Sequence, residues 1–222
     1  MQNFAKLFIL FIIYAFIGWL LEVIYALFVE KKFVNRGFLI GPYSPIYGVG
    51  VILIVSLLKK YANDILTVFI LASFICMALE YFTSFIMEKL FNARWWDYSN
   101  MKFNLNGRIC LETAIPFCLG GIFVMYKINP LLEKLIDYMG STTTIVGITL
   151  MIIFLVDIII SAIVVLKVKD YSITKFKDDT EKLNDKIKEY LMVHSPLTKR
   201  LILSFPDFRA IKNKIKKSKS KI

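Results

Sequence analysis

The sequence has few of the residues that build metal sites and disulfides. It contains one histidine and three cysteines, Cys76, Cys110 and Cys118, which form no C-x-x-C pair and lie in or beside apolar stretches. Cysteines in such surroundings are typical of buried free thiols. His194 has no neighbour at ligand spacing, which indicates a surface histidine. We therefore expect no metal ion, no disulfide and no cofactor.

Motifs of nucleotide hydrolysis and of the common hydrolases are also missing. The chain has no G-x-x-x-x-G-K-[ST] loop, no H-E-x-x-H, no G-x-S-x-G and no Cys–His pair. If energy from ATP is used, another subunit must supply it. We expect no catalytic residue, and a non-enzyme is favoured, although the sequence leaves enzymatic activity open.

Apolar residues are abundant and clustered. They make up 57% of the chain, the mean hydropathy is +0.62, and the charged residues lie between long apolar runs. A helix that crosses the hydrocarbon core needs about 20 mostly apolar residues. The sequence therefore predicts an all-α polytopic membrane protein with about five transmembrane helices, near Phe4–Val29, Gly41–Leu58, Ile65–Leu90, Ile109–Ile128 and Thr142–Val168.

The charge of the loops predicts the orientation. The first segment is too long for a signal peptide and no A-x-A-like cleavage site follows it, so we interpret it as a retained span. Lys and Arg are concentrated in the first and third loops and in the tail. Positively charged loops remain in the cytoplasm. We therefore expect the N-terminus outside, and the first loop, the third loop and the tail inside.

The tail differs in composition from the rest of the chain. We divide the sequence into a transmembrane domain, residues 1–168, and a basic amphipathic cytoplasmic tail, residues 169–222. Thr174–Met192 carries apolar residues at helical spacing, and Phe208, Ile211 and Ile215 form a thin second stripe among lysines. Such a tail can lie on anionic lipid or can be a solvated segment that fixes topology, and both interpretations stay open.

Four acidic residues fall inside the apolar segments: Glu22, Glu80, Glu112 and Asp157. Acids within a membrane are costly and are usually paired or functional. Counting about 1.5 Å per residue along each helix places all four in the half predicted to face the cytoplasm. This pattern predicts a polar cavity at or just beneath that surface. The alternative is a structural network in which loop arginines neutralise the acids or the acids are protonated.

Helical spacing extends the acidic set. Glu80, Ser84 and Glu88 follow i, i+4, i+8 and share one stripe of a helix. Arg108 and Glu112 are spaced i, i+4 in the fourth segment. We expect these side chains to contribute to the same polar cavity.

Irregular backbone is predicted at the first cytoplasmic loop. Residues 35–48 place glycines and prolines in an apolar setting together with Arg36, Tyr43 and Tyr47. Gly permits unusual backbone angles and Pro breaks the hydrogen-bond ladder. Irregular backbone at membrane depth is tolerated where it is buried or lines a cavity, which makes this loop a candidate part of the site.

The third loop combines aromatic and polar residues. Its tryptophans fit an interfacial belt, whereas Asp97 and the block Asn104–Arg108 suit binding of a polar or charged group; a turn at the start of a helix is the other interpretation of that block. The candidate cavity-lining or substrate-binding residues are therefore Glu22, Arg36, Tyr43, Tyr47, Glu80, Ser84, Asp97, Asn104, Asn106, Arg108, Glu112 and Asp157.

These blocks together resemble a known family. The stretches Phe16–Tyr25, Asn35–Gly48, Glu80–Glu88, Trp95–Ser99 and Asn104–Leu111 resemble a bacterial family of multi-pass membrane proteins called putative ABC-transporter type IV, or putative ABC transporter permease. The resemblance covers roughly residues 14–112. The family occurs mainly in Gram-positive bacteria. The resemblance implies a protein of the cell membrane with a role in transport, and it carries over no substrate and no catalytic residue.

Three functions agree with the sequence. The favoured one is a permease-like subunit that moves a small polar or charged solute through a cavity in the cytoplasmic half of the bilayer, with a separate ATP-binding subunit. The alternatives are a membrane-embedded enzyme that acts on a lipid headgroup at the inner face, and a non-catalytic assembly or sensory subunit that binds partners through its tail. The lipid bilayer is the expected environment, a homo-oligomer stays open, and no nucleic acid is expected.

Overall fold

The computed structural model describes residues 1–31, 33–91, 93–175, 196–205 and 209–210. Helices make up nearly all of its regular structure, and each strand is two residues long. The elements in chain order are α1 (Gln2–Glu30), α2 (Pro45–Leu58), η1 (Lys59–Tyr61), α3 (Ile65–Phe91), β1 (Ala93–Arg94), β2 (Asn104–Leu105), β3 (Ile109–Cys110), α4 (Leu111–Phe123), η2 (Val124–Ile128), α5 (Asn129–Tyr138), α6 (Thr142–Lys175), α8 (Pro196–Ser204) and β4 (Arg209–Ala210).

The helices confirm the predicted all-α polytopic membrane fold. Four stretches of the described residues are long and apolar enough to cross a membrane: Gln2–Val29, Ile65–Phe91, Leu111–Tyr138 and Thr142–Leu166. The predicted span Ile109–Ile128 continues past its predicted end to Tyr138, because α4, η2 and α5 follow one another without a break. The predicted boundary at residue 168 falls inside α6. The predicted tail helix, from residue 176 on, and the stripe of Phe208, Ile211 and Ile215 lie outside the described residues.

The second predicted span contains a helix that is too short to cross the hydrocarbon core. α2 has 14 residues, a rise of about 21 Å, whereas the hydrocarbon core is about 30 Å thick. It begins at Pro45 rather than at Gly41, because a residue before proline is disfavoured in the helical region. Ser44 accordingly has extended backbone angles, and Pro45 occupies the first turn of α2, where its missing N–H costs nothing.

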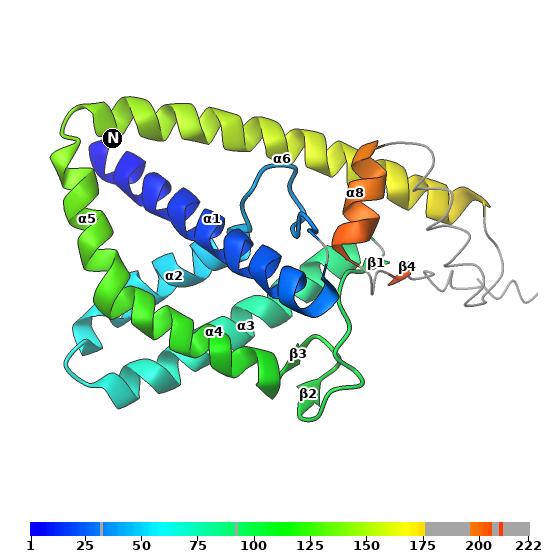
Figure 1. The fold of residues 1–222 in the computed structure, drawn as a ribbon, viewed down its shortest axis with the longest axis horizontal. Helices are drawn as coiled ribbons and strands as arrows, with labels where there is room; N and C mark the ends of the chain where they lie inside the picture. Colours follow the sequence, from blue (N-terminus) through cyan, green and yellow to red (C-terminus); the bar gives the residue numbers. More distant parts are fainter. Residues whose placement is uncertain (32, 92, 176–195, 206–208, 211–222) are drawn as a thin grey trace, which may run out of the picture.

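The helices run back and forth between two ends of the molecule (Figure 1). One end holds the N-terminus, η1 and the turn from α5 to α6. The other, which we call the loop end, holds the segment after α1, the β2–β3 hairpin and α8. The three parts that the loop charges predict to be cytoplasmic thus lie together.

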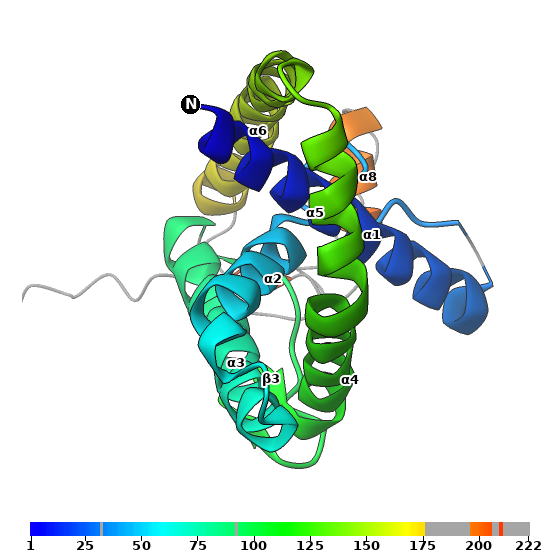
Figure 2. The ribbon, with the colours of Figure 1, turned by 90° about the vertical axis from the view of Figure 1, so that its left-hand side faces the viewer.

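α2 occupies the centre of the bundle. It packs against α1, α3 and α4, and the view along the bundle shows it enclosed by them (Figure 2). Its contact with α1 is close, because a Cβ at Gly48 would lie 2.6 Å from the backbone oxygen of Phe11. Small residues at such a crossing let membrane helices pack backbone to backbone.

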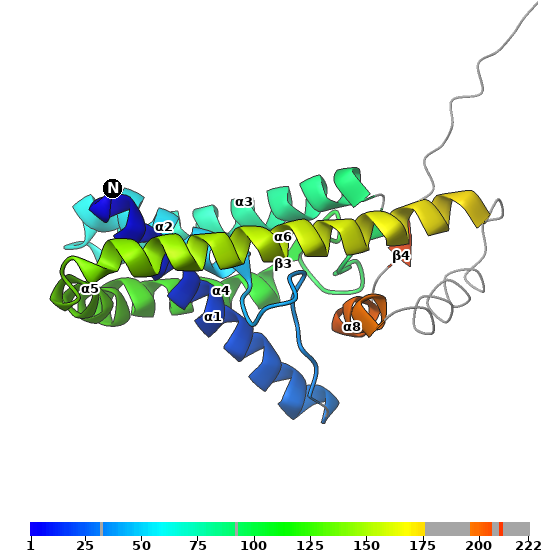
Figure 3. The ribbon, with the colours of Figure 1, turned by 90° about the horizontal axis from the view of Figure 1, so that it is seen from above.

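Apolar packing is concentrated at the end that holds the N-terminus. One buried cluster includes Ile54, Val68 and Met125, and a second includes Ile9 and Leu10. Toward the loop end, the second half of α1 leaves the bundle (Figure 3). Most buried polar side chains, Glu80, Ser84, Arg108, Asp157 and Ser161 among them, lie toward the loop end, whereas Asn129 and Thr143 are buried nearer the other end.

The span α4–η2–α5 contains a wide turn that bends it. Residues 124–128 form a π-helical turn, and Pro130 follows in the first turn of α5. Buried Asn129 accepts a hydrogen bond from Tyr14 (2.7 Å) and donates one to Glu133 (3.0 Å). Inserted turns of this kind kink helices, and this one directs α5 away from the axis of α4 (Figure 1).

Candidate functional site

The chain re-enters the bundle after α1. Residues 33–44, which we call the re-entrant segment, return along α1 until the N–H of Ser44 donates to the carbonyl of Ala15 (2.8 Å). Ala15 is near the middle of α1, so α2 begins about halfway along the membrane-spanning part. Near the other end of the segment, the indole N–H of Trp19 donates to Asn35 (2.7 Å).

Asp157 of α6 fixes the turn of the re-entrant segment. Its carboxylate accepts the backbone N–H groups of Ile40 (3.0 Å) and Gly41 (2.7 Å) and the hydroxyls of Tyr43 (2.5 Å) and Ser161 (2.9 Å). The ring of Tyr43 folds over Gly41, where a Cβ would lie 2.4 Å from it. The hydroxyl of Tyr43 is the donor in this contact, and the carboxylate of Asp157 accepts.

A second polar group joins α1, α2, α3 and the third loop. We call it the acid–tyrosine centre, and its members are Glu22, Tyr47, Glu80 and Tyr98. The hydroxyl of Tyr47 donates to Glu22 (2.6 Å), and the phenol of Tyr98 lies against the carboxylate of Glu80. The pKa of Tyr98 is raised first by burial and then by the charges of Glu80 and Glu22, which shows that both carboxylates act on one region.

Within the part of the chain that the structure describes, the carboxylates of the acid–tyrosine centre form no ion pair. Glu80 is 8% exposed. Among the residues that the structure describes, no ion pair involves Glu22, Glu80 or Asp157, because the ion pairs there use Glu88, Asp97 and Asp137. Asp157 is satisfied by four donors, whereas Glu22 and Glu80 face phenols. An arrangement of this kind attracts positive charge.

The third loop is folded around Asp97. Asp97 accepts hydrogen bonds from Ser99 and from Arg94 (3.4 Å). Gly107 has a φ of +65°, and a Cβ there would lie 2.4 Å from the Asp97 carboxylate, so glycine is required at this turn. Asn104 accepts the N–H of Gly107 (3.0 Å). Asp97 and Asn104 therefore shape the loop that carries Tyr98 and Arg108.

Arg108 ties this loop to α3. Its guanidinium pairs with Glu88 (2.9 Å), donates to Ser84 (3.2 Å) and lies over the rings of Tyr81 and Phe85. Ser84 and Glu88 are one turn apart, as the predicted stripe requires. Arg108 precedes α4, which begins at Leu111, so it is not on a helix with Glu112 as its spacing predicts; the extended strand β3 separates the two.

The structure brings most of the candidates into three groups. Glu22, Tyr47 and Glu80 meet in the acid–tyrosine centre, Tyr43 meets Asp157, and Ser84 meets Arg108. Asn106 bonds Tyr81 at the edge of the hairpin (3.0 Å). Arg36 lies half-buried in the re-entrant segment, and Glu112 is exposed in the first turn of α4, where its charge complements the helix dipole.

Two contributors were absent from the sequence candidates. Tyr98 lies in a block that tryptophans dominate. Its place in the acid–tyrosine centre follows from its contact with Glu80, which only the fold reveals. Arg200 belongs to the tail, yet its guanidinium reaches the carbonyl of Phe38 in the re-entrant segment (3.3 Å). No sequence spacing links residues 162 positions apart.

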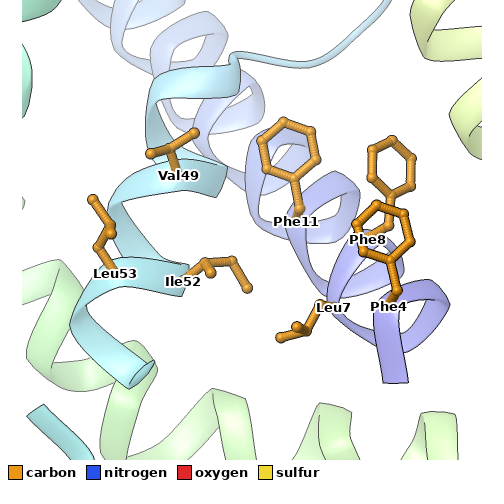
Figure 4. Close-up of a pocket in the computed structure, with 7 residues that line it drawn as sticks. All are labelled: Phe4, Leu7, Phe8, Phe11, Val49, Ile52 and Leu53. Atoms are coloured by element: carbon orange, nitrogen blue, oxygen red, sulfur yellow. The ribbon is translucent and has the colours of Figure 1, made fainter. Parts of the chain in front are cut away.

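Two further features of the described chain do not fit a polar solute or a metal ion. No group of three or more His, Cys, Asp or Glu side chains there could hold a metal ion. A shallow groove of about 210 Å³ lies between α1 and α2 near the N-terminus (Figure 4), and its lining is entirely apolar: Phe4, Leu7, Phe8, Phe11, Val49, Ile52 and Leu53. Such a lining fits hydrocarbon rather than a polar solute.

Comparison with known proteins identifies the family. No curated protein and no solved structure matches the chain. The family described as "Putative ABC-transporter type IV" matches residues 9–162, which include most of α1, all of α2 to α5, most of α6 and every candidate residue. This multi-pass membrane protein therefore belongs to the putative ABC-transporter type IV family.

Proposed function

We propose that the protein is a permease-like membrane subunit that moves a small polar or charged solute, and that the solute carries positive charge where it binds. The observation that carries the proposal is the acid–tyrosine centre. Glu22 and Glu80 come from two membrane-spanning helices and face phenols rather than lysine or arginine. A cation between them would complete the charge balance that the described residues leave open.

The short helix α2, which cannot cross the hydrocarbon core alone, supports this proposal. Discontinuous helices in transporters place irregular backbone and helix ends beside the solute site. Tyr43 lies two residues before α2 and Tyr47 lies in its first turn, and they bind Asp157 and Glu22 respectively. A shift at the start of α2 therefore changes both contacts together, which would let solute binding act on the re-entrant segment.

Glu80→Gln is expected to reduce strongly the stabilisation of the protein by cationic solutes. We would measure thermal unfolding of the protein in lipid nanodiscs with ammonium, choline, short alkylamines and polyamines. A bound cation at a hundredfold excess over its Kd stabilises the folded state by about 2.7 kcal/mol. Loss of one charge about 4 Å away costs on the order of 4 kcal/mol at an effective dielectric constant of 20, so binding should weaken at least about tenfold.

Glu112→Gln is the matched control. Glu112, like Glu80, lies within the residues that match the family, but its side chain is exposed at the start of α4. The Glu112→Gln variant should therefore keep the wild-type response to cations. If no cation in the panel stabilises the wild type, or if Glu80→Gln responds as the wild type does, the cationic solute is ruled out. An equal loss in both variants would indicate a general effect of negative charge.

A separate ATP-binding subunit is the second part of the proposal, and the family name motivates it. The tagged protein, purified in mild detergent at native level, should carry a stoichiometric ATP-binding protein that mass spectrometry identifies. Its repeated absence, with the chain alone or self-associated, would contradict ATP coupling and would favour a stand-alone carrier.

A further inference from the structure

α8 lies across the loop end of the bundle. It appears lengthwise in Figure 1 and end-on in Figure 3, whereas α6 is lengthwise in both views. It contacts the re-entrant segment directly: the hydroxyl of Ser204 donates to the carbonyl of Asn35 (2.6 Å) and Arg200 donates to that of Phe38. Just beyond α8, the ring of Phe205 packs against Trp95 at a centroid distance of 5.0 Å.

One face of α8 makes these contacts. Thr198, Leu201 and Ser204 follow one another at i, i+3, i+6 and are buried, with Leu201 only 1% exposed. Leu203, on another face, is 49% exposed. The helix is therefore docked through a narrow stripe, and Leu201 is its apolar contact.

Arg200 works against this docking. Among the residues that the structure describes, its Nε and Nη1 atoms are buried and have no hydrogen-bond partner, so the docked helix satisfies only part of the guanidinium. Burial lowers the pKa of Arg200, and the negative charge of Asp157 partly offsets that effect. A buried donor without an acceptor costs free energy that water would return. Lifting α8 would hydrate Arg200 and expose the carbonyls of Asn35 and Phe38.

We propose that α8 is a removable lid over the re-entrant segment, held by Leu201 and Ser204 and opposed by Arg200. The proposal rests on the proposed function, because it assigns the regulation of access from the loop end to the segment that Asp157 and α2 hold. In the docked position α8 covers the carbonyls of residues 35 and 38. When it lifts, the segment is open to water and to a solute at the loop end.

Hydrogen exchange in lipid nanodiscs tests the lid without requiring a known solute. Leu201→Asp should undock α8 and speed exchange of the backbone amides in residues 35–39 at least tenfold. Arg200→Met keeps the length of the side chain and removes the unpartnered N–H groups, so it should slow the same exchange several-fold. Leu203→Asp places a charge on the exposed part of the same helix and should leave exchange unchanged.

Each result decides one statement. Unchanged exchange in Leu201→Asp would overturn the lid, and faster or unchanged exchange in Arg200→Met would overturn the opposing role of Arg200. Exchange in α3 and α6 is the control for folding and must stay at the wild-type level. If it rises in Leu201→Asp, that variant is disrupted, and the Arg200→Met result alone decides, because slower exchange cannot result from unfolding. Cation-dependent stabilisation is measured separately. If cations do not stabilise the protein but the α8 variants change exchange as expected, the proposed function is overturned. If cations stabilise the protein but the α8 variants do not change exchange, the lid is overturned.

Discussion

Asp157→Ala is expected to be the most damaging substitution of an acidic residue in this protein. It removes the acceptor of two backbone N–H groups, Ile40 and Gly41, and of the hydroxyls of Tyr43 and Ser161. Each buried donor left without an acceptor costs about 1–3 kcal/mol, and lipid offers no replacement. We expect a loss of at least about 3 kcal/mol in the free energy of unfolding, measured by chemical denaturation in mixed micelles.

Two comparisons make this expectation specific. Asp157→Asn keeps one acceptor oxygen and should lie between the wild type and Asp157→Ala. Asp137→Ala removes an acid whose ion pair with Lys6 is exposed at the opposite end, and exposed pairs contribute about 0–1 kcal/mol. If Asp157→Ala costs no more than Asp137→Ala, the re-entrant segment does not depend on Asp157.

Gly48→Ala is expected to force α1 and α2 apart. The added Cβ would lie 2.6 Å from both the backbone oxygen and the ring of Phe11, and a backbone atom cannot move aside as a side chain can. Overpacking of this kind costs about 1–3 kcal/mol. Because α2 is central, the separation should also weaken the hydrogen bond from Tyr47 to Glu22, and the measurement is the yield of monodisperse protein together with its unfolding temperature.

Gly120→Ala is the matched control for Gly48→Ala. Gly120 also lies in a helix, but a Cβ there meets nothing within 4 Å. Alanine is favoured over glycine in a helix by about 0.5–1 kcal/mol, so this variant should be as stable as the wild type or slightly more stable. Equal behaviour of the two variants would show that the α1–α2 contact is looser than the structure indicates.

The sequence predicts the membrane class well, because it depends on local composition, and the same contrast of composition singles out the acids; their depth in the bilayer stays a prediction. A run of apolar residues is needed wherever a helix meets lipid, and Glu22, Glu80 and Asp157 stand out against such runs. The resemblance to the family likewise rests on short blocks of sequence, and the family match confirms it.

The contacts that define the site depend on distant residues. Asp157 binds Gly41 across 116 positions, and Ser204 binds Asn35 across 169. Hydropathy counts Gly41–Leu58 as one apolar segment, although its first residues are irregular backbone that Asp157 satisfies. Helical spacing likewise joins Arg108 to Glu112, although the extended strand β3 lies between them. Periodicity describes helices, and it fails where the chain leaves them.

The position of Asp157 also has a consequence for the order in which the chain is made. A ribosome adds about 5–20 residues per second, so Gly41 is synthesised several seconds before the carboxylate that holds it, 116 residues later. During that interval α2 is too short to span the bilayer alone, and its re-entrant start lacks its acceptor. The start of α2 therefore cannot reach its final structure until α6 has been made. A nascent chain stalled before α6 would expose the backbone N–H groups of Ile40 and Gly41 without their acceptor, a defect that cellular quality control could recognise.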